Sequence, residues 1–338
     1  MSMAAFMLTG SHRSSLKTAL HRSQQAPAIF GQRPAGRLPG GGRPAFLDQE
    51  TPNEFDSLEK LFFSCIQSAD DKCALSCLER LGRRFGSPNE RVAALRSLYD
   101  EAVAEGQSGL EQCLRNYDDI LSQTPVNLPI LKRRVALLRS LSRYTDAISS
   151  LVQLLEATPT DAEAWCELAE LYQSQGMGLQ AIFSLEEALL IVPHAWNVCP
   201  LAADRQKRLL TSDQVHARLG EVLYVYANSL GNDGVHKPLQ SSIQHFCRSV
   251  ELCNDYLRGF YGLALATSHT SVEGASKTTY GYDSLEQQSF KRLHALAMGK
   301  LAHILTTQCS LELHRRDYEE NELAAVKELL NGSPDPRL

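Results

Sequence analysis

No run of apolar residues in this sequence approaches the roughly 18 that a helix needs to cross a bilayer. Net positive charge is also missing: the formal charge of the 338 residues is −5, so no global basic field points to nucleic acid. The hydrophobic fraction of 43% and the charged fraction of 22% are ordinary for a soluble globular protein. We therefore expect no nucleic-acid partner and no transmembrane segment of its own, so that any work at a membrane is peripheral.

The sequence also lacks the motifs of catalysis and cofactor binding. It contains no GxxxxGKS/T, no HExxH and no GxSxG. The neighbouring acids Glu186-Glu187 and Asp118-Asp119 are more simply solvated helix faces than acid–base pairs. None of the nine cysteines forms a CxxC pair, and no second ligand pair accompanies Cys73 and Cys77, which lie one helical turn apart. The sequence predicts a protein that is not an enzyme, with no catalytic residue, cofactor or metal.

Residues 1–55 differ in composition from the rest of the chain. Basic residues and a cluster of glycine and proline precede the first acid, Asp48. Such a stretch buries too little apolar surface to offset the entropy of ordering it, so we expect a variable, disordered basic extension. An arginine-rich start without acids is also typical of a mitochondrial presequence, and this alternative stays open.

From Asp56 onward the pattern is helical. Apolar residues recur at three- and four-residue spacing, and glycine or proline breakers separate helices of about 12 to 16 residues. This rhythm predicts an all-α solenoid of antiparallel helix pairs over residues 56–310, in which Ser284–Cys309 forms a long capping helix. Residues 311–338 are expected to add a C-terminal helix and a tail.

An internal repeat with a period of 34 residues decides the architecture. Two sets of residues recur at this period: Pro125, Pro159 and Pro193, and also Ala147 and Ala181. The last repeat matches the tetratricopeptide consensus at seven positions: Trp165, Leu168, Tyr172, Ala181, Leu185, Ala188 and Pro193. The clearest repeats are predicted over 94–127, 128–161 and 162–195.

The residue types of this repeat follow from helix packing. Trp165, Leu168 and Tyr172 share one face of the first helix, because offsets of three and four return to the same side. Small Ala181 lets the second helix approach closely, and the proline ends the unit because it cannot continue a helix. Each pair leaves an apolar flank that its neighbour must cover, so several repeats in series are expected.

Two stretches, 197–214 and 231–238, are longer than a turn between repeats should be. Long loops on a solenoid are tolerated and often carry binding residues. An insertion without functional meaning explains the first stretch equally well, and the sequence leaves both readings open.

The first helix of each pair lines the concave surface of a tetratricopeptide array, where a partner segment is expected to bind. The candidate groove positions are Lys132, Ala136, Arg139, Glu163, Cys166, Glu170 and Gln173. They combine a basic repeat with an acidic one, which suits a partner carrying both signs of charge. The adjoining triplet Lys132-Arg133-Arg134 is either a solvated helix face or a basic patch for an acidic partner or membrane headgroups.

Residues beyond the repeat consensus resemble one particular family. The segments are DAEAWCELAELY (161–172), AIFSLEEA (181–188), Pro193-His194, DDKCALSCLE (70–79), PILKRRVALL (129–138) and LRGFYG (257–262). They are similar to subunit 2 of the endoplasmic reticulum membrane protein complex, most of all to its fungal branch. The resemblance runs from about residue 56 to residue 266.

This resemblance implies a non-catalytic scaffold on the cytosolic face of the endoplasmic reticulum membrane. Such a subunit holds other subunits of the complex together, soluble and membrane-embedded ones, and supports insertion of tail-anchored and multi-pass proteins. The alternative is a tetratricopeptide co-chaperone or an organelle-import adaptor, with a mitochondrial location through the arginine-rich start. A chaperone-tail clamp is disfavoured, because Lys132 fits it but Ala136 and Glu167 stand where asparagine is expected.

Overall fold

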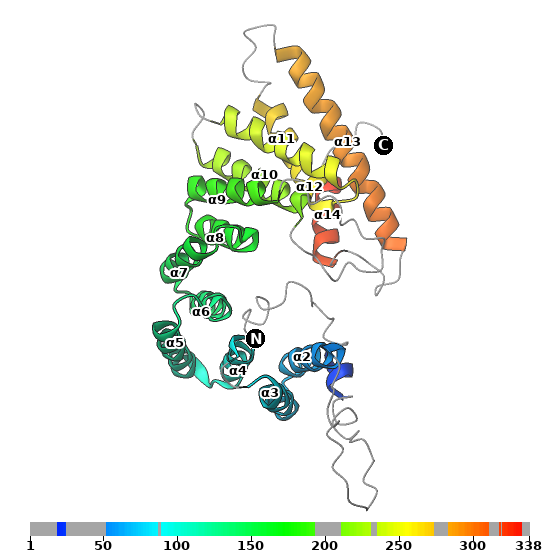
Figure 1. Cartoon of the computed structure of the whole chain (residues 1–338). Helices are drawn as coiled ribbons and strands as arrows, with labels where there is room; N and C mark the ends of the chain where they lie inside the picture. Colours follow the sequence, from blue (N-terminus) through cyan, green and yellow to red (C-terminus); the bar gives the residue numbers. More distant parts are fainter. Residues whose placement is uncertain are drawn as a thin grey trace, which may run out of the picture. The chain divides into compact units, whose positions relative to one another are not determined.

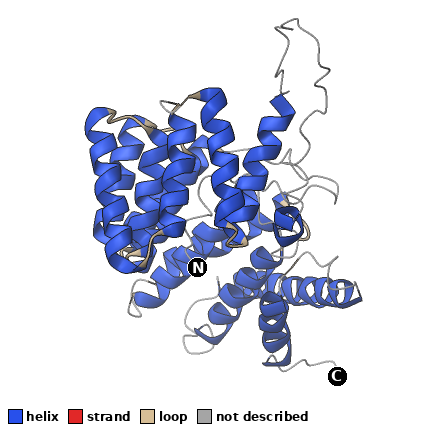
Figure 2. Ribbon diagram, turned by 90° about the horizontal axis from the view of Figure 1, so that it is seen from below, coloured by secondary structure: helices blue, strands red, loops and turns tan. Residues whose placement is uncertain are grey.

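The computed structural model shows helices as the only regular structure in the residues that it describes (Figures 1 and 2). The described residues are 19–24, 52–86, 89–192, 211–230, 235–273, 283–310, 318 and 320–332. Contacts group them into two units, one ending at Pro159 and the other beginning at Thr160.

The first unit is built from three successive helix pairs. Its helices are α2 (Pro52–Gln67), α3 (Asp71–Phe85), α4 (Glu90–Val103), α5 (Gly106–Gln123), α6 (Leu128–Ser140) and α7 (Tyr144–Ala157). Each helix packs against the next along the chain, and α4 also packs against α6. Contact between the first helices of neighbouring pairs is what stacking of tetratricopeptide repeats produces.

Polar side chains fix where several helices begin. The carboxylate of Asp70 accepts a hydrogen bond from the backbone N–H of Cys73 at 3.2 Å, and the Asn127 side chain accepts one from Ile130 at 3.3 Å. Asp161 caps the following pair in the same way. A side-chain acceptor at this position satisfies a backbone donor that the helix itself leaves unpaired.

A left-handed residue turns the chain between the two helices of a pair. Ser142 has φ 59° after α6, and Gly176 has φ 73° one repeat period later. Glycine adopts this backbone conformation without the steric cost that serine bears, so the turn is less strained in the later repeat.

The second unit contains seven helices in its described part. They are α8 (Ala162–Ser174), α9 (Gly178–Ile191), α10 (Ser212–Ser229), α11 (His236–Leu252), α12 (Leu257–Glu273), α13 (Asp283–Ser310) and α14 (Glu320–Gly332). Again each helix packs on its successor, and α10 also contacts α12. The pairing therefore continues beyond the clearest sequence repeats.

Phe246 of α11 is the centre of the tightest packing in the second unit. Its ring is 1% exposed and lies against Gly220 of α10 and Gly262 of α12. A Cβ atom on Gly262 would lie only 2.1 Å from Cε1 of the ring, and one on Gly220 would lie 3.0 Å from it. Three helices can meet around this phenyl ring only because two of them have no side chain there.

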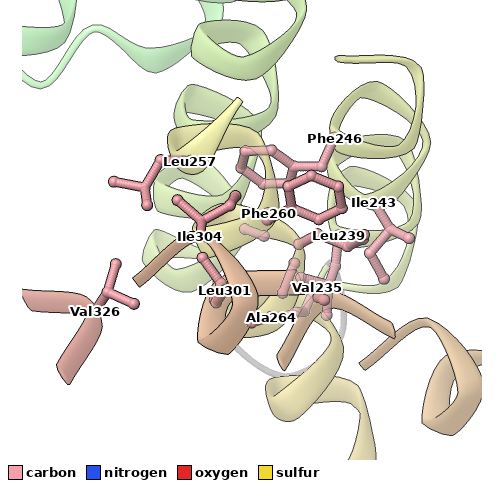
Figure 3. Packing of buried hydrophobic residues seen from close by; sticks show 14 residues of the cluster. Val235, Leu239, Ile243, Phe246, Leu257, Phe260, Ala264, Leu301, Ile304 and Val326 are labelled. Atoms are coloured by element: carbon pink, nitrogen blue, oxygen red, sulfur yellow. The ribbon is translucent and has the colours of Figure 1, made fainter. Parts of the chain in front are cut away.

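The last two helices close the apolar core of the second unit. Figure 3 shows Leu301 and Ile304 of α13 and Val326 of α14 converging on the side chains of α11 and α12. Tyr318, just before α14, is hydrogen-bonded to the start of α12: its hydroxyl donates to the carbonyl of Asp255 and accepts from the N–H of Leu257. These helices perform the capping role predicted for the C-terminal part.

The prediction of an all-α solenoid of antiparallel helix pairs is confirmed, and α13 matches the predicted capping helix to within one residue at each end. At the other end α2 begins at Pro52, four residues earlier than expected, and residues 19–24 are helical within the predicted basic extension. Ser23 there donates a hydrogen bond of 3.1 Å to Asp70. Pro193, most of 197–214 and part of 231–238 lie outside the described residues.

Replacing Gly262 with alanine tests the packing around Phe246. The added methyl forces the ring to move, and overpacking of this kind costs about 1–3 kcal/mol of unfolding free energy. Chemical denaturation of the purified chain measures the change. Gly299→Ala on α13 is the matched control, because nothing lies within 4 Å of its new methyl and helix propensity favours alanine. Equal effects of the two substitutions would show that Gly262 does not provide the space that the Phe246 ring occupies.

Candidate interaction surfaces

Ala181, Leu185 and Ala188 are buried in an apolar cluster of α8, α9 and α10, and Trp165 and Tyr172 are half-buried at its edge. Leu168 of α8 is also buried. Ala147 is fully buried one period earlier. Pro125 and Pro159 are exposed at the ends of their repeats, which leaves them the role of helix terminators.

Two of the predicted groove residues are not accessible to a partner. Ala136 is 6% exposed and Cys166 only 3%. Cys166 packs in the cluster that α10 covers, and burial raises the pKa of its thiol to about 11. The expectation that these two side chains line a binding surface was therefore wrong, because both are buried inside their units.

The remaining groove positions fall into the two units. In the first unit, Lys132 and Arg139 are half-buried. In the second, Glu163, Glu170 and Gln173 are exposed, and Glu170 lies 3.6 Å from the guanidinium of Arg218 on α10. One groove made of all these residues remains a prediction.

Arg133, expected in a basic surface patch, is completely buried. Its Nε donates a hydrogen bond of 3.2 Å to Oε1 of Glu101, and a second guanidinium nitrogen bonds the other carboxylate oxygen. The Tyr117 hydroxyl also lies within hydrogen-bond reach of that carboxylate and 3.2 Å from the carbonyl of Ser97. One polar cluster therefore joins α4, α5 and α6, and the expected basic patch loses its central residue.

Burial dominates the electrostatics of this cluster. Desolvation raises the pKa of Glu101 and the neighbouring Arg133 opposes that rise, while the pKa of Tyr117 is raised mainly by burial. A buried ion pair offsets its own desolvation only while both partners are present. The cluster therefore stabilises the packing of α4, α5 and α6, and the guanidinium of Arg133 is not available to headgroups or an acidic partner.

A parallel interaction holds Arg134. Its Nε donates to Oδ1 of Asp118 at 2.7 Å, and its guanidinium also bonds the hydroxyl of Ser150 on α7. The residues Asp118, Arg134 and Ser150 are spaced by 16 positions, as are Glu101, Tyr117 and Arg133. Polar residues recurring once per helix were the signal that could have revealed both clusters.

Arg133→Met tests this assignment. The substitution leaves the Glu101 carboxylate buried without its partner, which costs about 3–5 kcal/mol of unfolding free energy. Urea denaturation measures the loss, and adding Glu101→Leu to Arg133→Met should restore most of it. Arg96→Met, at an exposed position of the same unit, should change little. A surface role for Arg133 predicts instead that both methionine variants are equally mild.

Two histidines meet between α10 and α11. Nδ1 of His216 lies 3.0 Å from Nδ1 of His245, the ring centres are 5.2 Å apart, and the ring planes differ by 27°. These values describe rings that meet edge to edge, with one N–H donating to the other nitrogen. Burial lowers the pKa of both rings, and His245 and Arg248 lower that of His216 further, to about 4.

This histidine pair predicts a loss of stability in acid. Because the folded state holds the His216 pKa near 4 while an unconstrained histidine titrates near 6.5, the unfolded chain takes up protons first. The contribution of the neutral pair is therefore complete above pH 6.5 and lost as the pH falls towards 4. Thermal unfolding followed over this range should show a weaker pH dependence in His216→Gln than in the exposed control His303→Gln. Identical slopes would contradict the pairing.

A cleft of about 530 Å³ opens between α11 and α13 in the second unit. Its walls include the apolar side chains of Ile243, Cys247, Phe290 and Leu293. Among the described residues there is no cluster of three His, Cys, Asp or Glu side chains that could hold a metal ion. Nor is any helix in this described part long and apolar enough to cross a membrane.

The chain is similar in sequence to several known proteins. Residues 89–210 match the family described as the EMC2 TPR-like repeat domain. Over 316 residues the chain is 27% identical to TPR repeat protein oca3 of Schizosaccharomyces pombe, covering 93% of this chain and 95% of that protein. It is 29% identical to ER membrane protein complex subunit 2-A of Xenopus laevis, covering 62% of this chain and 61% of the frog protein.

A budding-yeast relative and a solved structure complete the comparison. The ER membrane protein complex subunit 2 of Saccharomyces cerevisiae is 25% identical, covering 62% of this chain and 67% of the yeast protein. A tetratricopeptide repeat protein from Parabacteroides merdae superposes with a TM-score of 0.40 and 15% identity, covering 82% of this chain and 98% of that one.

Paired helices, the 34-residue period and the buried alanines define a tetratricopeptide-repeat protein. Within that class, the chain is similar to subunit 2 of the endoplasmic reticulum membrane protein complex, and residues 89–210 match the repeat domain of that family. The fungal-branch assignment stays a prediction.

Proposed function

We propose that this chain is a non-catalytic scaffold subunit of the endoplasmic reticulum membrane protein complex, acting on the cytosolic face of the membrane. In this role it joins soluble and membrane-embedded subunits and supports insertion of tail-anchored and multi-pass proteins. The observation that carries the proposal is the family match over residues 89–210, whose described part comprises the helix pairs α4–α9.

The polar clusters of the structure support a role in binding over one in catalysis. Glu101 and Arg133 pair with each other inside the first unit, and His216 and His245 pair inside the second. In both clusters the hydrogen bonds join helices of the same unit, which is a structural role. What the molecule offers to other proteins is the outward surface of its helices.

Recovery of the tagged chain from membranes solubilised in mild detergent tests this proposal. We expect it to co-purify with integral membrane proteins of the endoplasmic reticulum, in a complex that survives gel filtration. Cells lacking the chain should insert a tail-anchored reporter less efficiently, as measured by glycosylation of its luminal tail.

Arg133→Met, which breaks the buried ion pair of the first unit, should lower both recovery and insertion, with Arg96→Met as its matched control. Arg96→Met should leave both unchanged. Elution of the wild-type chain as a free monomer, or recovery only with a soluble chaperone, would contradict the proposal.

A further inference from the structure

One face of α9 is apolar and uncovered. The helix buries Ala181, Leu185 and Ala188 against its neighbours. On the opposite side Leu179 is 61% exposed, Phe183 55% and Leu190 74%. Single exposed apolar residues are ordinary, but three on one side of one helix form a patch of the kind that marks an interaction surface.

The exposed residues form a continuous stripe along α9. Leu179, Phe183, Glu186 and Leu190 follow one another at spacings of four, three and four, which return to the same side of a helix. At its middle, the Phe183 ring meets the half-buried ring of Trp165 edge to face, with centres 6.2 Å apart. The apolar surface therefore extends from α9 onto α8. We call these four residues of α9 the α9 stripe.

The charge of the two helices that carry this apolar surface, α8 and α9, has a single sign. Residues 160–192, which contain α8 and α9, include six acidic residues and no lysine, arginine or histidine. Glu186 lies within the stripe and is exposed, and Glu163 and Gln173 are exposed on α8. Any partner therefore meets an apolar row with a carboxylate at its centre and further carboxylates on the neighbouring helix.

We propose that the α9 stripe binds a basic amphipathic helix of another protein. The partner would place apolar side chains at four- and three-residue spacing against Leu179, Phe183 and Leu190, and a lysine or arginine against Glu186. Helices commonly bind in this way, with their apolar residues anchored along a complementary apolar row. Complementary charge then selects the partner and speeds the encounter.

The same charge argues against other occupants. In a twofold dimer, Glu186 and the other acidic residues of α8 and α9 would face the same acidic residues of the second copy, and these like charges would repel. An anionic membrane surface would be repelled for the same reason. A basic helix satisfies both the apolar row and the carboxylates.

This inference specifies a class of partner for the scaffold proposed above, and it rests on that proposal only for the claim that the partner belongs to the same complex. Binding of a peptide to the isolated chain can therefore fail while co-purification with membrane proteins succeeds, and the reverse can also occur.

Fluorescence anisotropy with two synthetic helical peptides tests the α9 stripe on the full chain. One peptide carries a leucine stripe flanked by lysines, and the other has the same leucines with glutamates for lysines. We expect the lysine peptide to bind and the glutamate peptide not to bind. Phe183→Ser and Glu186→Lys should each weaken binding of the lysine peptide about tenfold or more, and added salt should weaken binding to the wild-type chain.

Val225→Ser is the matched control, because Val225 is 53% exposed on α10, outside the α9 stripe, and its loss should leave binding unchanged. Glu186→Lys should in addition gain affinity for the glutamate peptide, which a merely misfolded variant would not do. Circular dichroism of each variant checks that the helices remain.

Four results would overturn the proposal. The two peptides could bind equally, or Phe183→Ser could leave the affinity unchanged. Phe183→Ser could convert a dimer into a monomer in light scattering, which would make a second copy the occupant. The lysine peptide could bind only after residues 201–210 are deleted, which would make that basic segment of the same chain the occupant.

Discussion

Close approach of paired helices is the constraint on which the rest of this structure depends. It is possible only where a side chain is small or missing, at Ala147 and Ala181 in the clear repeats and at Gly220 and Gly262 around Phe246. Where the helices approach this closely, the leucines beside them interdigitate and exclude water, and burial of that apolar surface supplies most of the driving force for folding. The larger residues of the core fit because the small ones leave room for them.

This constraint also explains what the polar residues do. A helix pair packed this closely has no room for a solvated charge in its interior, so a buried guanidinium such as that of Arg133 must find a carboxylate, and Glu101 provides it. His216 and His245 meet the same demand by sharing one hydrogen bond. These buried polar groups thus serve the packing of the helices, and recognition is left to the outer faces of the helices. The scaffold role proposed above needs several such faces, and paired helices provide them.

The sequence predicted the fold well because helix pairing is a matter of periodicity. The 34-residue period, and the apolar residues at helical spacing in the segment that forms α13, can be recognised in the sequence without knowing any contact. The surfaces could not be predicted in the same way. Periodicity shows which positions are apolar, but Phe183 on the exposed side of α9 and Leu185 on its buried side are alike in that respect. Nor does it show that Arg133, in a basic triplet, turns inward, because this depends on a carboxylate two helices away.

Hydrogen–deuterium exchange of the chain, free and within the purified membrane complex, tests the central claim most directly. If the outward surface of the helix pairs is what other proteins bind, amides of exposed helix faces such as α9 should exchange more slowly in the complex. Amides in the seams between paired helices should be protected to the same degree in both states. Unchanged exchange on every exposed face, with new protection confined to the seams, would contradict the account.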